Sequence, residues 1–245
     1  MNKYFLLIIL ILMNCVLFSQ QPTADELLAY VDNNEIFETI QYEGEMVIYH
    51  QNRRIVKTMN AWGRGNSDSF IEFTNPEDRG TRYLKRGGRL MVYSPDVEGV
   101  MLISGHLLRE SMMGSDLSYE DTIDNDKLSA RYTPSIIGTE EIDDRLAWIL
   151  ELNAISRTES YPKRQLWIDV ENFDLLKQEL FALSGAKLKE YKLIRVETLA
   201  GRRFPVETEF KDLLRRGSRT VVIMKNVILD QPISDSVFTE RNLRR

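Results

Sequence analysis

The stretch RGTRYLKRGGRLMVYSP, residues Arg79–Pro95, decides the fold of this protein. Its two halves are rich in residues that favour strands, and Gly87-Gly88 separates them. A two-residue turn between strand-like runs is a strong signal for a β-hairpin. The sequence therefore predicts an antiparallel hairpin here.

Strand-like segments with short connections continue on both sides of the hairpin, about five before a central break and six or seven after it. The further candidates cover residues 42–50, 53–62, 67–74, 99–104, 127–142, 145–155, 164–170, 175–183, 188–199, 203–213 and 219–229. Short connections between consecutive strands favour an antiparallel meander. One helix precedes the strands, because Thr23 and Glu26 form a capping box, and we expect it to end near Asn33.

The strand pattern breaks at GHLLRESMMGSDLSYEDTIDNDKL, residues 105–128, where helical spacing predicts two short helices. Gly114 and Ser115 would end the first helix, and Asp116 to Asp121 would begin the second. Neighbouring residues on a helix cannot both face one core, so one of Met112 and Met113 should face a second apolar surface. Methionine is adaptable and suits surfaces that accept variable apolar shapes.

These elements predict a mainly β (α+β) fold with residues 21–245 as a single domain. An open sheet of about twelve strands twists and curls. We therefore expect a strongly curved antiparallel sheet that forms an incomplete β-barrel, with helices covering its concave face. Such an architecture is typical of proteins with a ligand cavity.

Residues 1–20 are predicted to be a secretory signal peptide. Lys3 precedes an apolar run from Tyr4 to Phe18, and Ser19 suits the position before a cleavage site. The sole cysteine, Cys15, lies inside this segment. Acylation of Cys15 as a lipoprotein anchor is the alternative, although Asn14 replaces the small residue that usually precedes such a cysteine.

The formal net charge of −5 argues against a general nucleic-acid binder. Local basic patches occur in LRRGSR (Leu214–Arg219) and in the C-terminal RNLRR. At a hairpin tip or chain end such charges are usually solvated, but they could also meet anionic headgroups.

Enzymatic and metal-binding readings find little support in the sequence. His106, Ser111 and Asp116 are five residues apart, so on a helix they point to different sides, and Ser111 has no nucleophile-elbow motif. The acids between Asp116 and Asp126 lack the glycine and distal glutamate of an EF-hand. We expect no catalytic residue, no metal and no cofactor.

Two motifs, Asn75–Pro95 and Ser111–Asp121, resemble the LolA-like outer-membrane lipoprotein-sorting family, whose fold LolA, LolB and LppX share. The resemblance extends from QQPTADELL to the ending ISDSVFTERNL. It implies an incomplete barrel with helices in its open mouth, which carries acyl chains across the periplasm. In LolA an arginine locks the lid, and the candidates for it here are Arg53 and Arg109.

The leading hypothesis is a periplasmic, non-enzymatic carrier of lipoprotein acyl chains or lipids toward the outer membrane, with an inner-membrane transporter and an outer-membrane acceptor as possible partners. The residues expected to line its cavity are Met46, Ile48, Ile71, Phe73, Leu108, Met112, Met113, Trp148 and Leu150. A shift of one residue would move every strand side chain to the other face. Two alternatives stay open, namely an accessory of a membrane exporter and a structural or interaction protein, which a cavity filled by its own side chains would favour.

Overall fold

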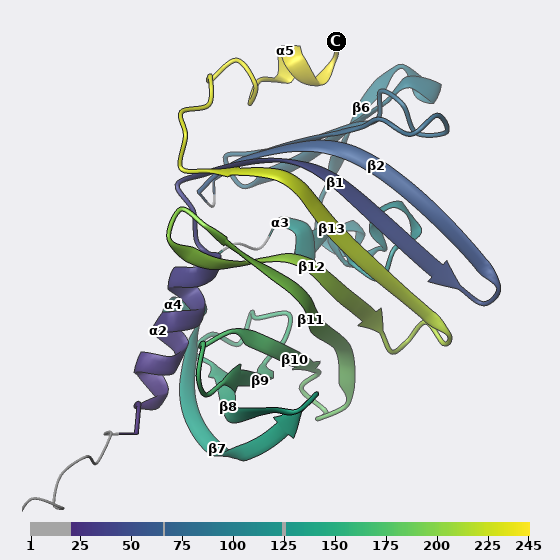
Figure 1. Cartoon of the computed structure of the whole chain (residues 1–245). Coiled ribbons are helices and arrows are strands. Elements are labelled where there is room, and N and C mark those ends of the chain that lie inside the picture. Colours follow the sequence, from purple (N-terminus) through teal and green to yellow (C-terminus); the bar gives the residue numbers. More distant parts are fainter. Residues whose placement is uncertain (1–20, 66, 124–125) are drawn as a thin grey trace, which may run out of the picture.

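The computed structural model describes residues 21–65, 67–123 and 126–245 (Figure 1). The predicted signal peptide and Cys15 lie outside the described residues. In the described part of the chain, thirteen strands form one antiparallel sheet. Six of them are β1 (Thr39–His50), β2 (Arg53–Arg64), β3 (Asp68–Phe73), β4 (Arg82–Arg86), β5 (Arg89–Ser94) and β6 (Gly99–Ile103). The other seven are β7 (Tyr132–Ile142), β8 (Arg145–Ala154), β9 (Lys163–Asp169), β10 (Leu175–Phe181), β11 (Lys187–Leu199), β12 (Arg202–Asp212) and β13 (Ser218–Leu229).

The predicted hairpin is present as β4 and β5. Arg86 pairs with Arg89 across the turn, and Gly87 and Gly88 have φ values of 58° and 74°. Both positions lie in the left-handed region that glycine enters without steric cost. The glycine pair thus sets the tight turn that the sequence indicated.

The sheet consists of two meanders joined at its centre. Its strand order is β6-β5-β4-β3-β2-β1-β13-β12-β11-β10-β9-β8-β7, so the first and last strands of the chain pair with each other. The sheet curls strongly, and its edge strands β6 and β7 do not pair (Figure 1). This confirms the predicted mainly β, strongly curved and incompletely closed architecture.

Helix α2 (Ala24–Glu35) packs on the concave face of the second meander. Its predicted capping box is present, since the Glu26 N–H donates to Thr23 Oγ1 at 3.2 Å and the Thr23 N–H donates to Glu26 Oε2 at 2.8 Å. Leu27, Leu28 and Val31 are buried against strands β8, β9 and β10. The helix therefore closes this part of the curve with its apolar face.

Residues 105–123, called the lid segment below, lie inside the curve of the first meander (Figure 1). The expectation of two short helices is met only in part, because the second is present as a short α-helix while 3-10 turns replace the first. The segment has two 3-10 turns, Gly105–Arg109 and Met112–Gly114, followed by helix α3 (Tyr119–Ile123), and helix α4 (Leu128–Arg131) comes after it. A regular helix cannot run through Met113, because its φ of 53° lies in the left-handed region, as does Gly114 at 77°.

The chain ends on the convex face. Helix α5 (Glu240–Leu243) and the residues before it run over strands β3, β4 and β5 (Figure 1). Phe238 and Leu243 are fully buried there against Phe70, Leu84 and Met91. The C-terminal residues are therefore a strap that covers apolar strand residues on the outer surface.

Within residues 21–65, 67–123 and 126–245, no helix combines the length and the hydrophobicity needed to cross a membrane.

Candidate functional site

All the strand residues predicted to line the cavity share one face of the sheet. Directly paired residues in a sheet point to the same side, and Met46 pairs with Val222, which pairs with Thr208. On the next strands, Phe210 pairs with Tyr191, Tyr191 with Gln178, Gln178 with Leu166, and Leu166 with Leu150. Since Thr208 and Phe210 are two residues apart on β12, the path from Met46 to Leu150 stays on the concave face.

Seven of the nine predicted residues meet in one apolar cluster beneath the lid segment. We call this the lid cluster. The sheet contributes Met46, Ile48, Ile71 and Phe73, and the lid segment contributes Leu108, Met112 and Met113. These side chains pack closely, as their small exposed fractions show: 3% for Met46, 2% for Ile48, 0% for Phe73 and 3% for Met112. In this arrangement the lid fills the concave face with its own side chains.

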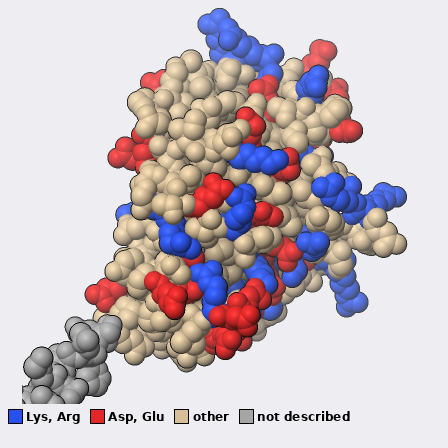
Figure 2. Space-filling view, viewed as in Figure 1, with Lys and Arg blue, Asp and Glu red and all other residues tan. Residues whose placement is uncertain are grey.

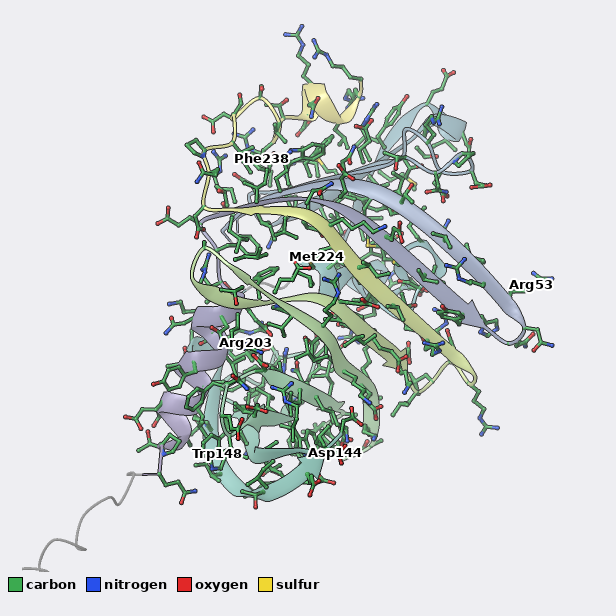
Figure 3. The ribbon with its side chains drawn as sticks, in the orientation of Figure 1. Arg53, Asp144, Trp148, Arg203, Met224 and Phe238 are labelled. Carbon is green, nitrogen blue, oxygen red and sulfur yellow. The ribbon has the colours of Figure 1, made fainter. Side chains whose placement is uncertain are left out.

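The other two predicted residues, Trp148 and Leu150, belong to a separate cluster under helix α2. Figure 3 shows Trp148 close to this helix and far from the hairpin tips on the opposite side. Trp148 stacks on Phe173 with ring centroids 5.9 Å apart, and Leu150 is fully buried. The structure therefore does not bring Trp148 and Leu150 into contact with the lid cluster.

Met112 and Met113 both pack against the lid cluster, contrary to the expectation that one of them faces a second apolar surface. The left-handed backbone at Met113 turns consecutive side chains toward the same core, which a regular helix would not allow. The sulfur of Met113 accepts a hydrogen bond from the Tyr83 hydroxyl at 3.1 Å. The two methionines thus form one continuous apolar surface beneath the lid.

Asp116 fastens the lid segment to strand β13. Its Oδ2 accepts hydrogen bonds from the hydroxyls of Ser218 at 2.9 Å and Thr220 at 2.6 Å. Its N–H donates to Thr220 Oγ1 at 2.9 Å, and its Oδ1 accepts from the Asp212 N–H at 3.2 Å. The three partner residues all belong to the strands of one hairpin, β12 and β13, so this contact holds the lid at a single place.

Arg215, in the turn between β12 and β13, clasps the lid beside Asp116. Its Nη2 donates to the Gly114 carbonyl at 2.9 Å, and its Nη1 donates to Ser111 Oγ at 3.2 Å and to the Ser115 carbonyl. Arg53, one of the two arginines proposed from the sequence, lies at the tip of the β1–β2 hairpin (Figure 3), and the other, Arg109, lies in the lid itself. Arg215 therefore joins the β12–β13 turn to the lid segment.

A third contact holds the start of α3. The Asp121 carboxylate pairs with Lys189 of β11 and accepts from the Tyr161 hydroxyl at 2.8 Å and the Ser118 hydroxyl at 2.6 Å. Burial raises the pKa of Asp121, but the charge and hydrogen bond of Lys189 and the hydrogen bonds of Ser118 outweigh this and leave it below its usual value. Burial and the charge of Asp121 raise the pKa of Tyr161, which therefore stays a protonated donor.

Sequence reasoning missed Arg215, Ser218, Thr220 and Lys189. Arg215 was noted only as part of a basic patch. A signal for the two hydroxyls does exist, because Ser218 and Thr220 precede Val222 at alternate positions and so face inward among apolar residues. Nothing local to Lys189 indicates its partner, which is 68 residues away.

The structure does not assemble a catalytic triad from His106, Ser111 and Asp116. Ser111 Oγ donates to the Ser115 carbonyl at 2.6 Å, and Asp116 binds Ser218 and Thr220, while His106 is exposed. In the described ranges, no group of three or more His, Asp or Glu side chains could hold a metal ion. Asp124, one of the acids considered above for calcium, lies outside those ranges.

A sequence model of a protein family described as "Uncharacterized protein" matches residues 65–245. The chain belongs to this family. Among curated proteins, none is significantly similar to it in sequence.

Solved structures similar to this family member have the LolA-like fold. A DUF1329 family protein from Desulfovibrio piger has a TM-score of 0.81 at 23% identity, covering 90% of this chain and 97% of its own. A LolA superfamily protein from Nitrosomonas europaea has a TM-score of 0.74 at 24% identity, covering 90% and 99%. A domain named for outer-membrane lipoprotein sorting, from Vibrio parahaemolyticus, has a TM-score of 0.76 at 18% identity, covering 91% and 97%. The LolA-like resemblance read from the sequence is therefore confirmed at the level of the fold.

Proposed function

We propose that this protein is a periplasmic, non-enzymatic carrier that binds acyl chains of lipoproteins or lipids beneath its lid and moves them toward the outer membrane. The observation that carries the proposal is the two-sided character of the lid segment. Its underside places Leu108, Met112 and Met113 in the lid cluster, while its margins are fastened by polar contacts from Arg215, Asp116 and Lys189.

This arrangement suits opening and closing. Polar groups at the margin can exchange their partners for water when the lid moves, so they lose little net free energy, on the order of 1 kcal/mol for each hydrogen bond. The apolar surfaces of the lid and sheet would then lie exposed, and an acyl chain would replace the contacts they had lost. Burial of each methylene contributes about 0.8 kcal/mol, so a chain of ordinary length offsets the opening of the lid.

The predicted signal peptide supports a periplasmic location, and the LolA-like fold supports a binding role. In this proposal an inner-membrane transporter supplies the acylated cargo and an outer-membrane acceptor receives it. Trp148 and Leu150 extend the concave apolar face beyond the lid cluster. A long chain would reach them only after passing Thr208 and Gln178, two polar residues on the same face between the clusters.

The proposal is tested by native mass spectrometry and lipid extraction of protein purified from the periplasm. Acyl species should co-purify with the parent protein, and M112D/M113D should lose them. The matched control is M101D/L102D, which places the same charges on β6, where the two side chains are 55% and 49% exposed. A parent protein that carries no lipid and takes up no fluorescent fatty acid would rule out the carrier.

One observation favours a second candidate, an interaction protein of the outer membrane. The lid cluster is filled by the protein's own side chains, as expected if the curved sheet is a rigid support and not a container. This candidate differs from the carrier in that its lid never opens. The same uptake measurement would then find no bound lipid in the parent, nor in R215A, which lacks the Arg215 contacts to the lid.

A further inference from the structure

Two hairpin tips lie side by side at one end of the sheet. The turn between β1 and β2 carries Gln51 and Asn52, and the turn between β12 and β13 spans residues 213–217. His50 pairs with Ser218, and the Gln51 N–H donates to the Gly217 carbonyl at 3.3 Å. Residues 51–55 and 212–217 therefore form one continuous surface, which we call the tip.

The tip is basic although the whole chain is acidic. Its two segments contain four arginines, Arg53, Arg54, Arg215 and Arg216, and a single acid, Asp212, against a formal net charge of −5 for the chain. Arg53, Arg54 and Arg216 are exposed, and within the described residues they form no ion pair. Figure 2 shows Lys and Arg side chains projecting together from the right-hand edge, where Figure 1 places the hairpin tips.

The tip is also apolar at its outermost point. Leu214 is 75% exposed and Leu213 39% exposed, directly before Arg215 and Arg216. Exposed leucines beside unpaired arginines match a lipid surface, because the leucines enter the boundary between headgroups and acyl chains while the arginines meet anionic headgroups. An acidic protein partner would complement the arginines but would give Leu214 no apolar environment unless it also offered a pocket.

We propose that the tip docks this protein on an anionic membrane surface, with Leu213 and Leu214 inserted and Arg53, Arg54 and Arg216 bound to headgroups. The purpose of docking rests on the proposed carrier function. Arg215 connects the tip to the lid, because its side chain donates a hydrogen bond to the Gly114 carbonyl. A docked protein would hold the edge of its lid beside the headgroups, where acylated cargo enters or leaves.

The test is flotation of the purified protein with phosphatidylcholine vesicles, with and without phosphatidylglycerol. We expect binding only to the anionic vesicles and weaker binding at high salt. Each arginine near an anionic surface strengthens binding by about fivefold, so R53Q/R54Q/R216Q should bind about a hundredfold more weakly. The matched control R241Q/R244Q/R245Q removes three exposed arginines at the distant C-terminus and should bind as the parent does.

Insertion is measured separately with an environment-sensitive dye attached to a cysteine introduced at one position. The only cysteine of the sequence, Cys15, lies in the predicted signal peptide, so the dye should label the introduced cysteine alone. A dye on Leu214→Cys should shift to shorter wavelength on anionic vesicles. A dye on Leu183→Cys should not, although Leu183 is 89% exposed in the turn between β10 and β11.

Three results would overturn the docking surface: no flotation of the parent, equal losses in the tip and C-terminal variants, or equal dye shifts at both positions. Flotation failure combined with a protein crosslinked through the tip would assign the tip to a protein partner. Fatty-acid uptake without vesicles separates this inference from the proposed function. R53Q/R54Q/R216Q should lose flotation and retain uptake. A parent protein that takes up fatty acid but does not float with anionic vesicles contradicts only the tip. A parent protein that floats but takes up no fatty acid contradicts only the carrier.

Discussion

Asp116 and Thr220 bind each other through two reciprocal hydrogen bonds. The Thr220 hydroxyl donates to Asp116 Oδ2 at 2.6 Å, and the Asp116 N–H donates to Thr220 Oγ1 at 2.9 Å. Both residues are buried, with exposed fractions of 2% and 0%. Because neither group can reach water while the lid is closed, the pair acts as a specific fastening between the lid and the sheet.

Replacing Asp116 with Ala should loosen the lid. The change leaves the buried hydroxyls of Ser218 and Thr220 without their acceptor, which costs about 1–3 kcal/mol. We expect faster amide hydrogen exchange in residues 105–123 than in the parent. Asp96→Asn, at an exposed site in a 3-10 turn, serves as the control. Unchanged exchange in the lid of D116A would show that apolar packing alone holds it.

Lys189→Met should loosen the lid at neutral pH, and mild acid should reverse part of this effect. Burial of Asp121 raises its pKa, and without the charge of Lys189 this effect is less opposed. In the parent the folded-state pKa is depressed, so the stabilisation is present above the usual value near 4 and is lost as the pH falls through the folded-state value. In the variant the folded-state pKa is higher, so the closed lid binds a proton more readily than it does in the parent, and acid relieves part of the cost of burying the unpaired carboxylate. Lid protection factors should therefore be higher at pH 5 than at pH 7 in the variant and should agree in the parent.

The control for that experiment is Lys192→Met. Lys192 lies on the same strand, but its partner Asp143 is 68% exposed at a distant turn. Exposed ion pairs contribute little, about 0–1 kcal/mol. An equal pH dependence of lid protection in both variants would contradict a specific role for Lys189.

Glu35→Gln should stabilise the protein at alkaline pH and not at acid pH. Burial at the end of α2, with a further contribution from Asp32, raises the pKa of Glu35 to about 7 despite the opposing charge of Arg164. Between the unfolded value near 4.5 and pH 7, the unfolded state loses its proton first, so stability falls as the pH rises. Urea unfolding should show E35Q about 1–3 kcal/mol more stable than the parent at pH 8 and equal to it at pH 4. The exposed Glu38→Gln should differ at neither pH.

Phe238→Ala should detach the C-terminal strap. The ring is fully buried on Phe70, Leu84 and Met91, and the Arg64 guanidinium lies 4.8 Å from its centroid. Removal of a buried phenylalanine costs about 3–5 kcal/mol. The midpoint temperature of thermal unfolding should therefore fall, and protease cleavage within residues 233–243 should become faster. Val237→Ala, at a partly buried neighbour, should cost about 1 kcal/mol or less, and similar losses in both variants would argue against Phe238 as the anchor.

The sequence by itself determined the elements whose signals are local. The Thr23–Glu26 capping box, the Gly87-Gly88 turn and the inward face of β1 through Met46 and Ile48 all depend on residues within a few positions of one another. The curl of the sheet also followed, because strand number and twist decide it. These local features were sufficient to predict the LolA-like architecture. Of the nine residues predicted to line the cavity, the structure places seven in the lid cluster.

Only the tertiary structure decided how the lid is built and held. The conformation at Met113 depends on packing and not on helix propensity, so Met112 and Met113 turn to the same core. Asp116 and Thr220 are 104 residues apart, and Arg215 and Gly114 are 101 apart. A polar side chain can pair with any complementary group, and its partner is chosen only when the curled sheet and the lid bring one within reach.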